Sequence, residues 1–196
     1  MRVRDESKIE AIFQNALKMI VEVGFDGLSM QKLAKAAGVS PATIYIYFED
    51  REDLLLQLYI QESEIYFAYV LEGFDPEMDF ATGLSVQWKN RAQYIIDHPD
   101  KAHFMEHFKY TPLYKKWAVH KNKAFLDAMH RFVEKAIANK ELIQMPSEVY
   151  WSVAFAPLMN LVQWHKSGKS IGGQPFRLTD EMLQQTLTLV LKALRP

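Results

Sequence analysis

Residues 41–48, with the sequence PATIYIYF, concentrate isoleucine, tyrosine and threonine on about two helical turns. At about 100° per residue, Ile44 and Phe48 share one face of a helix, whereas Thr43 and Ile46 point away from it. An outward isoleucine can touch thymine methyl groups in the major groove of DNA, and an outward threonine can hydrogen-bond base edges. Tyrosine hydroxyls suit phosphate oxygens, which position a protein on the duplex. These residue types are therefore candidates for DNA recognition.

The alternative is that the outward side chains pack against another part of the same chain, and the neighbouring elements help to decide. Ser29 is a good N-cap for a short helix that stops at Gly38. Ser40 caps the next helix, with Pro41 at the first helical position, where its missing N–H costs nothing. Two short helices joined by a turn that contains glycine have the layout of a helix-turn-helix, which favours the DNA interpretation.

Helical periodicity dominates the rest of the chain, and strict alternation is not convincing anywhere. A first helix runs through residues 9–23 and is capped by Gly24, and a longer one starts at Asp50 and ends at Gly73. Further helices are predicted over residues 77–97, 100–110, 112–140, 147–167 and 179–195, with a glycine-rich loop over 168–178. The sequence predicts an all-α protein.

The amino-acid composition limits the kinds of partner that the chain can bind. The 23 basic residues nearly balance 24 acidic ones, and residues 1–60 hold 7 basic and 9 acidic side chains, so DNA attraction must come from a local patch. The basic residues available for that patch are Arg2, Arg4, Lys8, Lys32 and Lys35. The chain has no cysteine, which excludes disulfides and thiolate chemistry and fits the cytoplasm. The longest apolar stretch, residues 151–164, is shorter than the ~20 residues of a membrane span, so no membrane partner is expected.

The sequence contains few of the motifs that indicate an enzyme or a metal site. His103 and His107 have the i, i+4 spacing of metal ligands, but the glutamate that follows the first histidine of a zincin motif is absent. No phosphate-binding glycine loop and no nucleophile elbow occurs. We therefore expect neither a metal, nor a cofactor, nor catalysis. An all-helical enzyme or a ligand-binding module without sequence-specific DNA binding remains the alternative.

The segment around the predicted turn resembles the DNA-binding signature of the TetR family of bacterial transcriptional regulators, and the close match covers about residues 8–60. The matching residues are Gly38, Val39, Ser40, Ile44, Tyr45, Tyr47, Phe48, Arg51 and Leu54. The resemblance implies base contacts from Pro41, Ala42, Thr43 and Ile46, with Gln31 as a helper, and phosphate contacts from Ser29, Tyr45, Tyr47 and Arg51. The sequence departs from the pattern at two positions, since Ala42 stands where glycine is common and Arg51 where lysine is common.

The resemblance also implies a DNA-binding domain over residues 1–49 and an effector-binding and dimerisation domain over 50–196. Two DNA-binding heads must be held about one helical turn of DNA apart, which demands a homodimer on a (pseudo)palindromic operator. We predict a four-helix dimer interface built from the last two helices, with Leu183, Leu187, Val190 and Leu194 as contacts. The alternative is that this apolar seam serves the internal core.

The middle of the chain is rich in aromatic residues, which at helical spacing form either core or a ligand cavity. The resemblance implies a cavity for a small apolar or aromatic effector, and it implies a repressor that this effector releases from DNA. The predicted lining residues are Trp88, Phe104, Phe108, Trp117, Phe155 and Met159.

Overall fold

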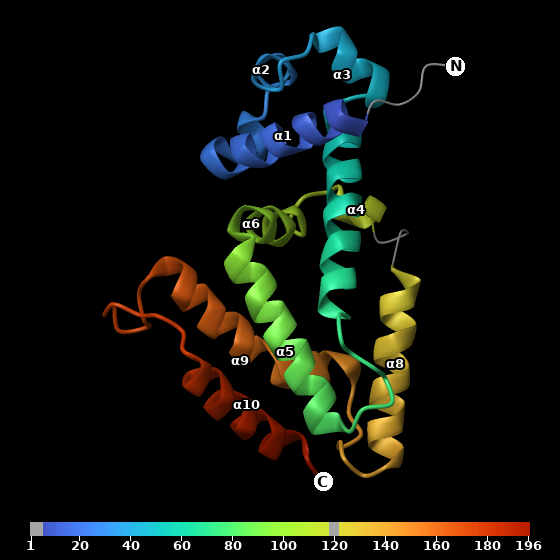
Figure 1. Cartoon of the computed structure of the whole chain (residues 1–196), viewed down its shortest axis with the longest axis vertical. Helices are drawn as coiled ribbons and strands as arrows, with labels where there is room; N and C mark the ends of the chain where they lie inside the picture. The colour runs from blue at the N-terminus through green and yellow to red at the C-terminus, as the bar shows by residue number, and fades with distance from the viewer. Residues whose placement is uncertain (1–5, 118–121) are drawn as a thin grey trace. The chain divides into compact units, whose positions relative to one another are not determined.

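The computed structural model of the chain describes residues 6–117 and 122–196, without the side chain of Trp117. Within them every regular element is a helix, and one isolated bridge joins Lys169 to Pro175 (Figure 1). The helices are α1 (Glu6–Gly27), α2 (Met30–Ala36), α3 (Pro41–Tyr47), α4 (Arg51–Val70), α5 (Phe80–Asp97), α6 (Pro99–Phe108), α7 (Tyr114–Trp117), α8 (Lys123–Ala138), α9 (Ser147–Ser167) and α10 (Asp180–Leu194). The predicted all-α class is confirmed.

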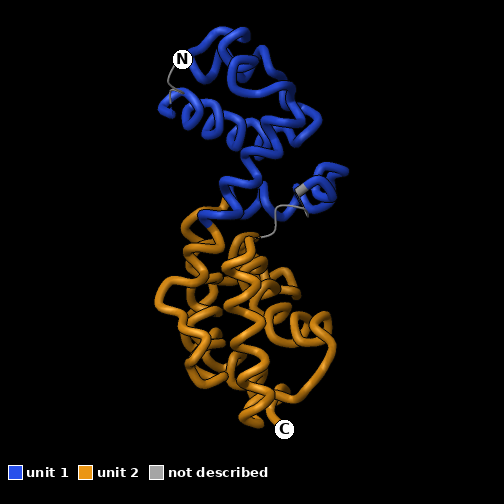
Figure 2. The backbone as a smooth tube through the Cα atoms, turned by 90° about the vertical axis from the view of Figure 1, so that its right-hand side faces the viewer, with its two compact units in different colours: residues 1–65, 100–121 blue, residues 66–99, 122–196 orange. Residues whose placement is uncertain are grey.

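The helices form two compact units, each with a hydrophobic core of its own (Figure 2). Unit 1 comprises residues 1–65 and 100–121, and unit 2 comprises residues 66–99 and 122–196. The boundary falls within α4. Packing thus groups most of α4, together with α6, with the N-terminal helices, whereas the division by function at residue 50 stays a prediction.

Short polar contacts set the helix starts where the sequence predicted them. The Ser40 hydroxyl accepts a hydrogen bond from the backbone N–H of Thr43 at 3.1 Å, which caps α3. At the start of α4, the Asp50 carboxylate accepts from the N–H of Asp53 at 2.8 Å, and the Asp53 carboxylate accepts from the N–H of Glu49 at 2.9 Å. This reciprocal pair satisfies N–H groups that a helix start leaves without partners.

The predicted single helix over residues 112–140 is wrong, because the structure has α7 and α8 there. Asn122 caps α8, its side-chain oxygen accepting from the N–H of Phe125 at 2.9 Å. Asparagine offers the backbone a local partner and so begins a new helix instead of continuing one. At Gly24 the backbone takes φ +73°, which interrupts the helical geometry as predicted, although α1 resumes and extends to Gly27.

In unit 2, helices α5, α8, α9 and α10 enclose one core. Trp88 of α5 is completely buried, and its indole N–H donates to the carbonyl of Ala154 in α9 at 2.8 Å. Helices α9 and α10 lie side by side (Figure 1). Because a buried indole N–H requires a partner, this bond fixes the register of α5 on α9.

Candidate functional site

A tight turn joins α2 to α3 in unit 1. The N–H of Gly38 donates to the carbonyl of Lys35 at 3.3 Å, and the N–H of Val39 donates to the carbonyl of Ala34 at 2.9 Å. Gly38 has φ +68°, a left-handed conformation that glycine adopts without steric cost. These two bonds are the Schellman arrangement that ends a helix. The turn therefore gives α2 and α3 the helix-turn-helix layout that the sequence predicted.

Helix α3 has a buried face and an exposed face. Ile44 is fully buried, and Phe48 at the C-cap is buried with its ring 5.4 Å from that of Phe13. On the opposite side Ile46 is 62% exposed, and Tyr45, at the edge of the buried face, is 55% exposed. Exposed apolar side chains of this size at adjacent positions are available to a partner. The burial of Ile44 and Phe48 and the exposure of Ile46 agree with the prediction from helical spacing.

Two of the hydroxyl groups predicted to contact DNA take part in helix capping. The hydroxyl oxygens of Ser40 and Thr43 lie 2.9 Å apart, and either can be the donor. Ser29 caps α2 by accepting from the N–H of Lys32 at 3.5 Å. A hydroxyl has one donor and two acceptor lone pairs. Thr43 and Ser29 thus hold the short helices in place and retain capacity for a further bond.

The side chain of Arg51, which was predicted to contact a DNA phosphate, bonds to the protein itself. Its Nη2 donates to the carbonyl of Phe25 near the end of α1, and its Nε is buried without a hydrogen-bond partner. Much of this guanidinium is therefore engaged with the protein, where it joins α4 to the end of α1. Tyr47 is half-buried and packs on the core of unit 1, which leaves part of its ring exposed.

The other residues predicted to contact DNA lie on the surface of unit 1: Gln31, Pro41 and Ala42. Lys8, Lys32 and Lys35 are also exposed, whereas Arg2 and Arg4 lie outside the described residues. Glu49 and Asp50 are exposed just after α3. The face of the helix-turn-helix thus mixes both signs of charge, as the composition indicated.

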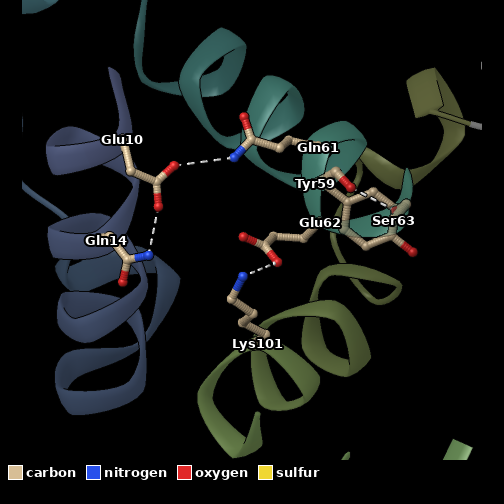
Figure 3. Close-up of polar contacts among 7 residues, drawn as sticks. All are labelled: Glu10, Gln14, Tyr59, Gln61, Glu62, Ser63 and Lys101. Atoms are coloured by element: carbon tan, nitrogen blue, oxygen red, sulfur yellow. Dashed lines mark hydrogen bonds and ion pairs between the residues drawn. The ribbon is translucent and has the colours of Figure 1, made fainter. Parts of the chain in front are cut away.

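Polar contacts join α4 to α1 and α6 within unit 1 (Figure 3). The Lys101 ammonium lies 2.9 Å from the Glu62 carboxylate, and Glu62 is only 2% exposed. Gln61 donates to the Glu10 carboxylate of α1 at 3.5 Å. A buried carboxylate needs a close cation to offset its lost hydration. The Lys101–Glu62 pair therefore joins α6 to α4.

The six residues predicted to line an effector cavity do not form one cluster within either unit. Phe104 and Phe108 are fully buried in the core of unit 1, where Tyr59 stacks on Phe108 with ring centroids 4.1 Å apart. Trp88 and Phe155 belong to the core of unit 2. Met159 is partly exposed on α9, and the side chain of Trp117 lies outside the described residues. Their contact with an effector stays a prediction.

Arg91 of α5 was missed by sequence reasoning. It is buried in unit 2, where its Nη1 donates to the Tyr66 hydroxyl at 2.7 Å and its Nη2 donates to the Gln87 amide oxygen at 3.1 Å. Burial raises the pKa of the nearby Tyr150 phenol, and the positive charge of Arg91 acts in the opposite direction. A charged residue three positions after Trp88 on the apolar stripe of a helix was the available signal.

The four residues predicted as dimer contacts on α10 face the core of their own chain, and their contact with a second copy stays a prediction. Leu187, Val190 and Leu194 are buried in the core of their own chain, and Leu183 packs against the same core. A regular apolar stripe is used by the nearest core, which here is internal. The opposite face of α10 carries Leu189, which is 60% exposed. Other apolar side chains exposed on α9 and α10 are Val149, Trp151, Ala156, Met159, Met182 and Ala193.

Neither a metal site of three ligands nor a membrane-spanning helix occurs among residues 6–117 and 122–196. The rings of His103 and His107 lie 4.2 Å apart, but across residues 6–117 and 122–196 no three histidine, aspartate or glutamate side chains come together as a metal site. None of the helices in that part of the chain combines the length and apolar character needed to cross a membrane.

The fold and the turn geometry define a helix-turn-helix protein. Residues 12–58 match the family of bacterial regulatory proteins named tetR. An uncharacterised HTH-type transcriptional regulator of Haemophilus influenzae is 29% identical over 115 residues, which cover 59% of this chain and 62% of that protein. The chain spans less than two thirds of the length of such curated relatives. Residues 12–58 are therefore similar to the DNA-binding segment of the TetR family.

Solved structures extend the likeness over the whole chain. A TetR-family transcription regulator from Marinobacter aquaeolei VT8 is 28% identical with a TM-score of 0.75, covering 100% of this chain and 99% of the other. The regulator FadR from Bacillus subtilis, solved in complex with stearoyl-CoA, is 18% identical with a TM-score of 0.74, covering 95% of this chain and 99% of the other. The second comparison shows a shared fold.

Proposed function

We propose that the chain is a DNA-binding transcriptional regulator that acts as a repressor in the bacterial cytoplasm. The observation that carries the proposal is α3 itself, a short helix fixed by Ile44 and Phe48 that exposes Tyr45 and Ile46. Helix α3 lies in the major groove, where Ile46 touches thymine methyl groups and the tyrosines contact phosphates. The lysines around the helix-turn-helix provide the attraction, so binding weakens steeply with salt.

The test is fluorescence anisotropy on labelled DNA obtained by selecting genomic fragments that the protein binds. Tyr47→Ala should abolish the preference over random duplex, whereas Tyr110→Ala, at an 84% exposed site outside the helix-turn-helix, should preserve it. Both variants lose the same side chain, so a general effect of tyrosine removal is controlled. A wild-type protein that selected no sequence would instead favour the ligand-binding module or the all-helical enzyme.

The regulator acts as a homodimer, because two heads are needed for a (pseudo)palindromic operator. We place the contact on the outer faces of α9 and α10, where Leu189 and Met182 are exposed. Leu189→Lys would bury an unpaired charge in this interface and should yield monomers in sedimentation. Leu126→Lys on the exposed face of α8 is the control and should remain dimeric. Monomeric wild-type protein at micromolar concentration would contradict the dimer.

A small apolar effector releases the repressor by shifting its population between two states. Helix α4 contributes residues 51–65 to unit 1 and residues 66–70 to unit 2, so a change in its position affects both. The stearoyl-CoA bound by the Bacillus FadR supports a ligand with an extended apolar part. By linkage, an effector that weakens DNA binding must itself bind less tightly in the presence of operator. A ligand that bound tightly but left DNA affinity unchanged would contradict this mechanism.

A further inference from the structure

Arg91 is a buried cation without a counter-ion. Its side chain is on α5 in unit 2, and only 5% of the residue is exposed. Among the residues that the structure describes, no carboxylate lies within ion-pair distance of it, and its two hydrogen bonds go to the neutral Tyr66 and Gln87. Its Nε is buried with no hydrogen-bond partner. The guanidinium therefore has spare donors and a charge that nothing in unit 2 balances.

Aromatic rings surround this charge. The guanidinium carbon lies 4.6 Å from the ring centroid of Phe155 and 5.3 Å from that of Trp151, with Phe125 and Tyr66 at 5.7 and 5.8 Å. Ring faces attract cations and offset part of the lost hydration, but they supply no hydrogen-bond acceptor for the unused N–H groups. Burying a charge without a partner lowers the free energy of unfolding, so this arrangement destabilises the ligand-free protein.

We propose that Arg91 binds the carboxylate of an effector whose remaining part is apolar. The proposal rests on the proposed function, since it names the chemistry of the molecule that releases the repressor. A carboxylate matches the planar guanidinium with two parallel hydrogen bonds and one opposite charge. A carboxylate brings one negative charge for this single cation, whereas a phosphate group would bring up to two. The surrounding rings provide the apolar contact for the body of the ligand.

The arrangement also indicates how the ligand enters and what it displaces. Trp151 is the most exposed of the four aromatic residues at 37%, so we place the entry of the ligand beside it. Nη1 has two N–H groups, and a carboxylate that takes the one now donated to the Tyr66 hydroxyl displaces this contact. Tyr66 belongs to α4, the helix that both units share. Binding at Arg91 thereby changes a contact of the helix that the proposed release mechanism requires to move.

The test uses the full-length protein with decanoate and naphthoate as probes and with decanol and naphthalenemethanol as neutral counterparts. Both carboxylates should raise the unfolding temperature and change the tryptophan fluorescence, whereas the alcohols should do so at least about tenfold less effectively. Arg91→Gln should weaken carboxylate binding about tenfold or more, and Arg91→Lys should weaken it less because the charge remains. Arg131→Gln, at an exposed arginine of unit 2, should leave binding unchanged.

Carboxylates that cause no shift, alcohols that act equally well, or unaltered binding in Arg91→Gln would each overturn the proposal. If Arg91→Gln failed to fold, the contrast between carboxylate and alcohol in the wild type and the behaviour of Arg91→Lys would still decide. Operator binding without ligand is measured separately, on the wild-type protein. Loss of specific DNA binding in the wild type would refute the proposed function, whereas a missing carboxylate effect alone would refute only the role of Arg91.

Discussion

Removing the same side-chain atoms at two nearby positions of α3 should affect two different properties, the stability of the fold and the preference for specific DNA. Ile44→Ala and Ile46→Ala both shorten isoleucine to alanine, but Ile44 is fully buried and Ile46 is 62% exposed. If α3 is a recognition helix held by its inner face, the first substitution affects stability and the second affects DNA preference. The pair separates the structural role of the helix from its binding role.

The expected magnitudes follow from burial. Truncating a fully buried isoleucine costs about 2–5 kcal/mol, a large share of the ~5–15 kcal/mol that stabilises a typical protein. Ile46→Ala should change stability by less than about 0.5 kcal/mol, since alanine is also the better helix former. If one methyl group of Ile46 is buried against a thymine, its loss costs about 0.8 kcal/mol, or roughly fourfold in operator affinity.

Urea unfolding followed by circular dichroism measures the first quantity, and anisotropy on specific and random duplexes measures the second. Ile171→Ala, at an exposed position in the loop after α9, controls for the loss of a surface isoleucine. Equal destabilisation by Ile44→Ala and Ile46→Ala would refute the two faces assigned to α3. Unchanged operator preference in Ile46→Ala would remove this residue from the proposed base contacts.

Three further predictions concern the rest of the chain. Gly83→Ala would place a Cβ against a ring carbon of the buried Phe132. The overpacking should destabilise the fold by about 1–3 kcal/mol, more than the ~1 kcal/mol gained in helix propensity. Adding Phe132→Leu to this variant should restore the unfolding temperature. Hydrogen bonds from Thr82 hold the pKa of Asp79 below its ordinary value of 3.8. The cap that Asp79 forms on α5 therefore stabilises the fold above that pH, and this stabilisation is lost as the pH falls through the folded pKa. Asp79→Ala should cost about 1 kcal/mol at pH ~7 and less in acid, as measured by urea unfolding. Arg91→Met should raise the unfolding temperature of the ligand-free protein, because an apolar side chain replaces an unbalanced buried charge; a lower temperature would show that the cation is structural.

The local parts of the fold could be predicted because their causes are local. A cap needs one side-chain oxygen and an N–H three residues later, so Ser29, Ser40 and Asp50 could be recognised from the sequence. The two faces of α3 follow from the same short range, since helical spacing alone separates Ile44 from Ile46. The orientation of Arg51 does not, because the Phe25 carbonyl that accepts its hydrogen bond lies 26 residues away in the sequence.

The assignment of apolar residues to a particular core depends on tertiary contacts that spacing does not contain. Phe104 and Trp88 are both completely buried aromatic residues on helices that are consecutive in the sequence, yet one belongs to unit 1 and the other to unit 2. Spacing alone puts Leu187 on the apolar stripe of α10, but only the packing of α10 on α9 and α5 shows that the core of the same chain covers it. Sequence periodicity identifies an apolar stripe, but it does not identify the surface that covers the stripe.

Arg91 shows a different kind of signal, which is a conflict with the pattern. Leu84, Trp88 and Ala92 lie on the buried side of α5, and an arginine on the same side opposes the burial that its neighbours favour. Sequences that fold well rarely keep such conflicts without a use, because each one costs stability. The conflict is greater here because no carboxylate balances the charge in the described part of unit 2. A ligand that brings the missing negative charge would remove the cost, and it would then favour whichever state of the protein holds Arg91 open to it.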